Sequence, residues 1–279
     1  MKIYISVDME GLAGISMWQE VDPGNKQSID LLQEHLKAVL DGLFDSGADI
    51  SEVVISDSHS RGDNIPYGIT KQYDRVKIVH GSLRKDFMMS GLNESFDRVF
   101  FIGYHAGIGC QNGIMDHTYS SSLVHNIWIN GKRMNEAVIN AAFAGYHGVP
   151  VALIVGDEML KRELKDLFMG KYEYVVTKEG ISRYAAIMKP ITSVMSEIKQ
   201  AVKKAVEIER HQLPLINFAN PVELRVEFKD TSYADAVELM PGVERIDGRT
   251  VSLSHDQYPV VFNALMAMIY IASSIRNAR

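Results

Sequence analysis

The sequence predicts an α/β fold, with a largely parallel sheet flanked by helices and a second, smaller α/β lobe. The first observation is that short β-rich runs alternate with segments of helical periodicity over the first half of the chain, as in β-α-β units. The second is that the rest of the chain is less regular, with helices, an alternating strand and an apolar closing segment. The third is size, because 279 residues, 46% of them hydrophobic, suffice for one large domain or two lobes.

The first half is expected to supply the buried strands of the parallel sheet. The run KIYISV, residues 2–7, is the first of them. A helix is expected over residues 29–46, where leucine, valine and phenylalanine recur at helical spacing before a stop at Gly47. Further buried strands are expected at EVVIS, VKIVH and RVFFIG, and at VPVALIVG after the helical pattern NEAVINAAFAGYHG.

The second half is expected to form the smaller lobe. It offers helices over residues 158–168 and 191–209 and the alternating strand VELRVEF. A boundary near Gly156 would separate a metal-binding lobe of residues 1–155 from a C-terminal lobe of residues 156–279. A single domain is the alternative, because no linker composition marks the boundary.

The closing segment PVVFNALMAMIYIASSI is the most apolar part of the chain. Pro259 and Asn263 interrupt it, and its length is near the lower limit of about 17 residues for a membrane span. We therefore expect a helix that is buried in the core or at a subunit contact, and no membrane partner.

Composition argues against nucleic acid as a partner and predicts a cytoplasmic protein. The 29 basic and 35 acidic residues give a formal net charge of −6, and no basic stripe of the kind that binds phosphate backbones is present. The single cysteine, Cys110, excludes an internal disulfide and fits a reducing compartment. We interpret it as an incidental thiol, because nearby acids would raise its pKa. The first acid, Asp8, comes before a signal-peptide apolar segment could be completed.

Polar side chains follow three of the predicted strands at the point where each strand ends. In SVDMEG, Asp8 and Glu10 lie two residues apart and point the same way, and carboxylates this close repel unless a cation or a shared proton lies between them. EVVIS is followed by His59, and RVFFIG is followed by His105. The carboxyl ends of parallel strands form the ligand-binding crevice of open α/β sheets, so two carboxylates and two imidazoles are expected at one rim.

Glu136, near the start of a predicted helix, could reach the same rim. This mixture of oxygen and nitrogen ligands suits zinc, and also manganese or cobalt, whereas the lack of a second cysteine excludes a thiolate-rich structural site. Taken singly, Asp8, Glu10 and His59 are also explained as turn or capping residues, and Glu136 as a first-turn helix acid. Their convergence on one sheet edge favours the metal site.

Four segments, in the same order along nearly the whole chain, resemble motifs of the zinc-dependent D-aminopeptidase family, whose founding members were named dipeptide transport proteins. They are residues 6–11 (SVDMEG), 57–60 (DSHS), 103–106 (GYHA) and 113–117 (GIMDH). The first motif is short and moderately specific, and the ordered set of four is far more so. The resemblance implies a zinc metallopeptidase that forms ring-stacked homodecamers, with active sites that open on an inner channel.

Carried over position by position, the resemblance implies a site with two zinc ions per subunit. His117 matches the family's catalytic histidine, for which we favour acid/base action over a role as nucleophile. Asp116 before it could orient the imidazole, alter its pKa or pair with the α-amine of a peptide. Asp8 is the expected bridge between the metals, and the implied zinc ligands are Asp8, Glu10, His59, His105 and Glu136.

These residues predict a metal-dependent aminopeptidase that hydrolyses short peptides, including those with a D-residue at the amino end, by a water activated between two zinc ions. One alternative is another metal-dependent amidase or esterase that uses the same site. The other is a non-catalytic peptide-binding component of a transport system, as the older family name suggests. Asp116, before the catalytic histidine, differs from the family pattern, so the choice between D- and L-residues stays open. Residues 61–67 also diverge, which changes the surface expected to set specificity.

Overall fold

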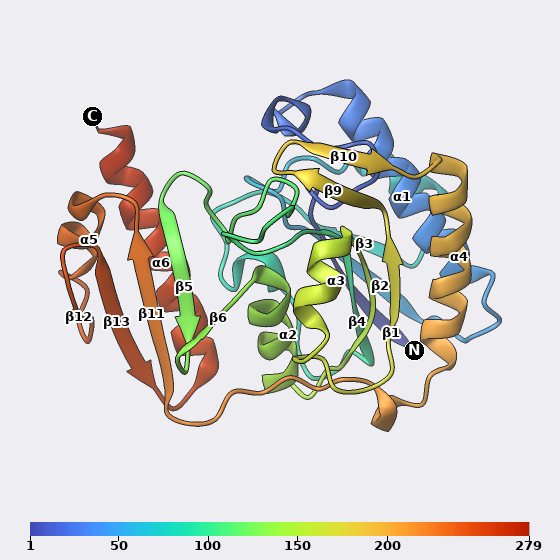
Figure 1. The fold of residues 1–279 in the computed structure, drawn as a ribbon. Coiled ribbons are helices and arrows are strands. Elements are labelled where there is room, and N and C mark those ends of the chain that lie inside the picture. Colours follow the sequence, from blue (N-terminus) through green and yellow to red (C-terminus); the bar gives the residue numbers. More distant parts are fainter. Residues whose placement is uncertain (279) are drawn as a thin grey trace.

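The centre of the structure is a six-stranded sheet whose neighbouring strands all run parallel, in the order β3-β2-β1-β4-β7-β8 (Figure 1). The computed structural model describes residues 1–278. The strands are β1 (Lys2–Val7), β2 (Glu52–Asp57), β3 (Val76–Val79), β4 (Arg98–Tyr104), β7 (Val151–Gly156) and β8 (Glu173–Val176). The largely parallel sheet predicted from the sequence is therefore confirmed.

Strand β1 lies at the topological switch point of this sheet. Its last residue, Val7, pairs with Asp57 of β2 on one side and with Ile102 of β4 on the other. The chain extends the sheet from β1 first through β2 and β3, and later in the opposite direction through β4, β7 and β8. The carboxyl ends of β1, β2 and β4 thus lie side by side, in the position where open α/β sheets bind ligands.

Helices cover both faces of the sheet. Helices α1 (Lys26–Phe44) and α4 (Ile191–Glu207) pack against each other on one face, and α2 (Glu136–Tyr146) and α3 (Glu158–Leu164) lie on the other (Figure 1). Their apolar faces meet the strands in two hydrophobic clusters, one on each side of the sheet. The side chains of Asn25, Asn135 and Asp157 cap the amino ends of α1, α2 and α3.

A second, five-stranded antiparallel sheet forms the smaller part of the molecule, in the order β12-β13-β11-β5-β6. Helices α5 (Thr231–Val237) and α6 (Tyr258–Asn277) pack against it (Figure 1). The smaller α/β unit predicted from the sequence is therefore present. Its strands are β5 (Val124–Ile129), β6 (Lys132–Arg133), β11 (Val222–Phe228), β12 (Glu244–Arg245) and β13 (Thr250–His255).

The remaining elements are short. A hairpin of β9 (Lys178–Ser182) and β10 (Ala185–Met188) lies near the amino end of α1 (Figure 1). Short 3-10 helices occur at η1 (Trp18–Val21), η2 (Tyr67–Gln72), η3 (Phe87–Met89) and η4 (Arg210–Gln212). Segments η1 and η3 bring aromatic and apolar side chains to the site described below.

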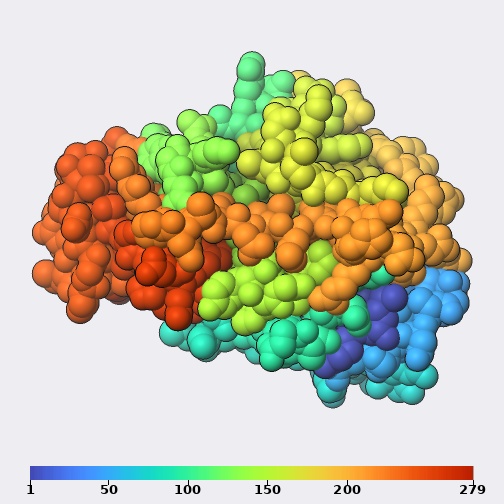
Figure 2. Space-filling model, turned by 90° about the horizontal axis from the view of Figure 1, so that it is seen from below, coloured from blue at the N-terminus to red at the C-terminus, as the bar shows by residue number. Residues whose placement is uncertain are grey.

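The two sheets divide the chain differently from the predicted lobes of residues 1–155 and 156–279. Strands β5 and β6 come from the first range and pair in the small sheet, whereas β8 comes from the second range and lies in the large sheet. The segment after α4 then crosses one face of the molecule to reach β11 (Figures 1 and 2). A boundary between folding units near Gly156 stays a prediction.

Helix α6 contains the whole of the closing apolar segment. By length and composition it is the one helix among residues 1–278 that could cross a membrane, and 39% of its most apolar window is buried. It packs against α2, α5 and strands β11 and β13. The prediction of a helix buried in the core is therefore confirmed for the part of α6 that packs against these elements.

Candidate metal centre

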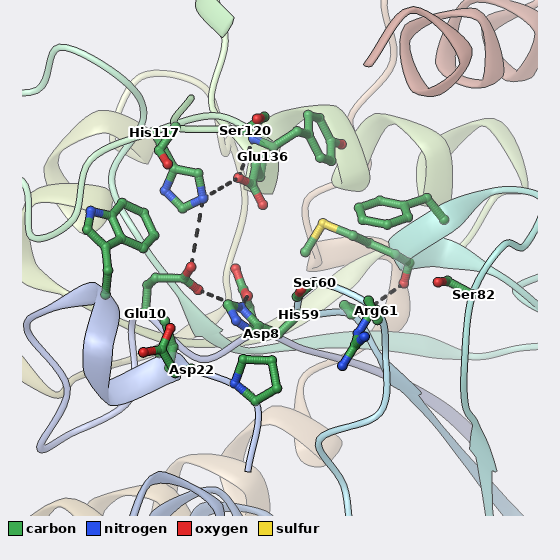
Figure 3. A pocket seen from close by; sticks show the side chains of 18 of the residues that line it. Asp8, Glu10, Asp22, His59, Ser60, Arg61, Ser82, His117, Ser120 and Glu136 are labelled. Atoms are coloured by element: carbon green, nitrogen blue, oxygen red, sulfur yellow. Dashed lines mark hydrogen bonds and ion pairs between the residues drawn. The ribbon is translucent and has the colours of Figure 1, made fainter. Parts of the chain in front are cut away.

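The structure brings six sequence-predicted site residues together at the carboxyl edge of the large sheet. Asp8 and Glu10 follow β1, His59 follows β2, and His105 follows β4. Glu136 is the first residue of α2, and His117 lies in the loop between β4 and β5. All six side chains are buried. Figure 3 shows the contacts from His59 to Glu10, from Glu10 to His117, and from His117 to Glu136.

Two glycines allow the loop of Asp8 and Glu10 to rest on the end of β4. A Cβ atom at Gly11 would lie 1.9 Å from the Tyr104 carbonyl oxygen, and one at Gly103, where φ is +75°, would lie 2.0 Å from the Asp8 carbonyl oxygen. The Gly11 amide instead donates to the Gly103 carbonyl at 2.7 Å. This close backbone approach holds both acids beside His105, and only glycine permits it.

Asp8, Glu10 and His59 form the first group of converging ligand atoms. The Nδ1 atom of His59 lies 3.1 Å from Oδ1 of Asp8 and 3.1 Å from Oε2 of Glu10. One atom from each residue lies within 4.8 Å of the other two. Two carboxylates and one imidazole at this spacing can surround one cation.

His105, His117 and Glu136 form the second group. Oε1 of Glu136 lies 3.5 Å from Nε2 of His105 and 3.7 Å from Nε2 of His117. The two imidazole rings stack, with their centroids 4.2 Å apart and their planes within 4° of parallel. The sequence predicts a catalytic role and no ligand role for His117, and in the structure its Nε2 lies next to the same Glu136 oxygen as that of His105.

Asp8 connects the two groups. Its Oδ1 faces His59 at 3.1 Å, and its Oδ2 lies 3.5 Å from Nε2 of His105. Glu10 makes a second connection, because its Oε1 lies 3.8 Å from Nε2 of His117. A carboxylate with one oxygen toward each group has the arrangement expected of a ligand that bridges two cations.

The hydrogen bonds of His105 and His117 fix the tautomer of each ring. Nδ1 of His105 donates to the Ala106 carbonyl at 2.9 Å, and Nδ1 of His117 donates to the Met115 carbonyl at 2.8 Å. These bonds place the proton on Nδ1 and leave the Nε2 lone pair facing the carboxylates. Nε2 of His105 is buried and has no hydrogen-bond partner. A buried polar atom without a partner is costly, so the donor set fits a metal ion such as zinc.

The electrostatics of the cluster favour added positive charge. Burial and the neighbouring carboxylate of Glu10 raise the pKa of Asp8 to about 7. Burial alone would lower the pKa of His59, but Glu10 and Asp8 raise it well above its usual value. Three buried carboxylates therefore draw protons onto their neighbours, as expected of a site built for cations.

The cluster forms the floor of a cavity of about 430 Å³. Trp18 of η1 lines it and packs edge-on against the His117 ring at 5.1 Å. Phe87, Met88 and Tyr270 contribute apolar lining, and Asp22 and Arg61 contribute charge (Figure 3). His105 is not among the residues that line the cavity. The cavity is large enough for a small ligand that contacts the cluster with one end.

Asp116 does not face the cavity. Its carboxylate pairs with Nε of Arg183 at 2.9 Å and accepts from the Gly109 amide at 2.6 Å. These contacts engage the carboxylate with groups other than the His117 imidazole. Asp116 is also not among the residues that line the cavity. The role as partner of a peptide amine, considered for Asp116 from the sequence, is not supported by this position.

Cys110 is also separate from the cavity. Burial and the carboxylate of Glu163 raise the pKa of its thiol to about 12. A thiol protonated at neutral pH is a poor nucleophile, which supports its interpretation as incidental.

Sequence reasoning missed Lys178, a fully buried residue of β9. Its ammonium donates to the carbonyl oxygens of Glu10, Leu12 and Ile15, so it holds the loop that follows β1. A single lysine at the start of a short edge hairpin carries no pattern in the sequence, and only the fold brings it to this loop.

Comparison with known proteins gives concordant results. A family model described as D-aminopeptidase matches residues 1–267. A D-aminopeptidase of Bacillus subtilis (strain 168) is 29% identical over 276 residues, which is 98% of each chain. The solved structure of the Zn-dependent D-aminopeptidase DppA from Bacillus subtilis, described as a self-compartmentalizing protease, is similar with a TM-score of 0.90 at 27% identity over 98% of each chain.

Proposed function

The chain belongs to the D-aminopeptidase family of peptidases, and from this premise we propose that it removes the amino-terminal residue, D-residues included, from short peptides at a site for two zinc ions. Family membership makes the chain a zinc metallopeptidase, and so a hydrolase. The zinc stoichiometry, the D-preference and the roles of individual residues belong to the proposal.

The observation that carries the proposal is the position of Asp8 between two groups of ligand atoms. Asp8, Glu10 and His59 would hold one zinc ion, and Asp8, His105 and Glu136 the other. Bound there, zinc supplies the Lewis acidity that polarises a scissile carbonyl and lowers the pKa of water toward neutrality. Three carboxylates would offset part of the metal charge. The neutral imidazoles would leave the remaining positive charge to polarise the scissile carbonyl.

His117 would act as the general acid and base. His117 lines the cavity, and its Nε2 lies 3.8 Å from Oε1 of Glu10 and 3.7 Å from Oε1 of Glu136. Its ring is fixed by the Nδ1 bond to Met115 and by the edge of Trp18. A neutral Nε2 can accept a proton from the attacking water and return it to the amine that leaves. With Asp116 paired to Arg183, the cavity-lining acid outside the cluster is Asp22, which is therefore the candidate partner of the substrate's α-ammonium group.

We also propose that the protein acts as a homo-oligomer in the cytoplasm. The description of the similar Bacillus subtilis enzyme as self-compartmentalizing supports an oligomer, and the part of α6 that is not buried offers apolar surface for a subunit contact. The decamer stays an expectation from the resemblance. The single cysteine supports a reducing compartment.

The test combines zinc content with hydrolysis. We would measure bound zinc by mass spectrometry on the wild type, on His105→Ala and on His80→Ala, and follow D-alanyl and L-alanyl p-nitroanilide before chelation, after chelation and after zinc is restored. His80 is the matched control, because it follows β3 as His105 follows β4 but is exposed and lies outside the cavity.

We expect about two zinc ions per chain in the wild type and in His80→Ala, and a loss of zinc and of turnover in His105→Ala. The faster of the two anilides gives the chirality preference. A substrate panel with esters and amides that lack a free α-amine separates the aminopeptidase from another metal-dependent amidase or esterase. A wild type that binds no zinc and cleaves neither anilide would reject the proposal in favour of a binding protein.

A further inference from the structure

The charges that line the cavity outside the metal cluster are few. Among the described residues, Arg61 is the one lining side chain that carries a guanidinium or ammonium group. Two serines with cavity-lining side chains, Ser60 and Ser82, lie near it and can donate hydroxyl hydrogen bonds (Figure 3). A basic group beside hydroxyl donors favours the binding of an anion next to Arg61. Much of the remaining lining is acidic or apolar.

The backbone of Arg61 is held at a fixed position next to the cluster. The Gly62 amide donates to the His59 carbonyl at 2.9 Å, and the side chain of Asn64 donates to the same carbonyl at 2.9 Å and to Asp57 at 2.8 Å. Ser60 adopts a positive φ of 51°, an uncommon conformation for a serine and one that recurs at functional sites. The loop after β2 is therefore tied to the strand that delivers His59.

The side chain of Arg61, in contrast to its backbone, is exposed and can contact a ligand. It is 65% exposed, and its ion partner Asp63, at 3.3 Å, is 40% exposed. A surface ion pair of this kind contributes at most about 1 kcal/mol, so a carboxylate that enters the cavity can replace it. Arg84, which is nearby, differs, because it donates to three backbone carbonyls and does not line the cavity.

We propose that Arg61 binds the carboxyl-terminal carboxylate of the peptide substrate and so makes the enzyme selective for very short peptides. The inference rests on the proposed function, because it takes the metal cluster as the place where the amide is cleaved. Arg61 is a specificity-determining residue in this proposal and has no part in the chemical step.

The reach of the chain sets the peptide length. Arg61 lies two residues after His59, so its Cα is at most about 7 Å from that of the metal-site histidine. In a dipeptide the terminal carboxylate lies about one residue length, roughly 3.5 Å, beyond the scissile carbonyl, and in a tripeptide about twice that distance. A carboxylate at either position falls within the span of an arginine anchored beside His59. Each further residue moves the carboxylate about 3.5 Å farther from the cluster, so the contact favours the shortest peptides.

The test compares a peptide that ends in a carboxylate with the same peptide ended by an amide. The substrates are alanyl-alanine and alanyl-alanine amide, of the chirality that the zinc-loaded wild type cleaves faster. We expect Arg61→Met to lower kcat/KM for the acid about 10- to 100-fold, the range for a lost charge-assisted hydrogen bond, and to leave kcat/KM for the amide within about twofold. Arg61→Lys should recover part of the loss, because it keeps the charge and loses the fork geometry.

Lys71→Met is the matched control. It removes the same charge at an exposed position of η2 outside the cavity, and it should leave both substrates unchanged. If the wild type cleaves both substrates and Arg61→Met slows both equally or slows neither, the carboxylate contact is rejected while the proposed function stands. If the zinc-loaded wild type cleaves neither, the proposed function fails, and the role of Arg61 fails with it.

Discussion

Lys178 shows how one buried side chain can hold a metal-binding loop in place. Its three hydrogen bonds end on carbonyls of the loop that carries Glu10. In Lys178→Met these acceptors lose their donor, which should destabilise the protein by about 1–3 kcal/mol. We also expect zinc affinity to fall about 10- to 100-fold, as for other residues that orient metal ligands.

Urea unfolding and competitive zinc titration measure these two effects of Lys178→Met. The control is Lys165→Met, which changes an exposed lysine after α3. Wild-type zinc affinity in a correctly folded Lys178→Met protein would show that the loop keeps its position without the lysine.

Arg183, in the turn of the β9–β10 hairpin, holds the loop of His117. Its guanidinium donates to the Asp116 carbonyl at 2.9 Å and pairs with the Asp116 carboxylate, and its own carbonyl accepts from the Met115 amide at 2.8 Å. Arg183→Met should lower kcat about 10- to 100-fold, since a small displacement of a proton-transfer group is costly, while zinc content stays at the wild-type value.

Stopped assays of kcat and KM, with zinc measured on the same samples, check the prediction for Arg183. Arg162→Met serves as the comparison, because it breaks an exposed ion pair with Glu158 on α3. Equal kcat values in the two variants would assign Arg183 a surface role only.

The residues of the candidate centre differ in how far the sequence predicts them. Asp8, His59 and His105 each follow a strand of one parallel sheet, so periodicity and strand ends alone place them at one rim. The predicted group of six side chains is together in the structure, while their roles as ligands and acid/base stay predictions. Lys178 and Arg183 could not be predicted, because their partners lie far away along the chain and the contacts depend on how a short hairpin folds back.

At the scale of the element, helix α1 is joined to the loop after β1 by a buried histidine. Nε2 of His35 accepts from the Ala13 amide at 3.1 Å, and Nδ1 donates to the Leu31 carbonyl at 2.7 Å. Burial lowers the pKa of His35 to about 4 from the usual 6.5. The folded protein therefore keeps this group neutral at pH values where the unfolded chain protonates it.

The unfolded state binds more protons between pH 6.5 and about 4, so the contribution of His35 to stability is complete above pH 6.5 and is lost as the pH falls toward 4. The difference corresponds to roughly 3 kcal/mol. Urea unfolding of the chelated protein at pH 4.5, 5.5 and 7 should show a steeper acid loss for the wild type than for His35→Gln. His255→Gln, at an exposed position of β13, should follow the wild type. Parallel curves for the wild type and His35→Gln would contradict the assignment.

Long elements with clear periodicity could be predicted, and short ones could not. The helices expected over residues 29–46 and 191–209 are confirmed as α1 and α4, with ends shifted by a few residues. Strand β5 escaped prediction because polar His125 and Asn126 interrupt its apolar run, and its pairing partner β11 lies far along the chain. Strand β8 is short and only partly buried at the sheet edge, so it lacks the continuous apolar run of β4 and β7.

At the scale of the whole molecule, the prediction concerns assembly. If the family resemblance extends to quaternary structure, mass photometry of the zinc-loaded protein should give particles of about ten chains, each of 31.2 kDa. The same measurement after chelation reports whether the metal contributes to the assembly. A species of single-chain mass at micromolar concentration would contradict the proposed homo-oligomer.

The route of the chain between His117 and Glu136 makes the smaller sheet inseparable from the candidate centre. After His117 the chain leaves the large sheet, forms β5 and β6 in the small sheet, and returns to begin α2 with Glu136. A gene fusion or a terminal deletion cannot add or remove the small sheet intact, because two of its strands lie inside the span that joins these two residues. Excision of the smaller sheet would therefore also break the chain that connects His117 to Glu136.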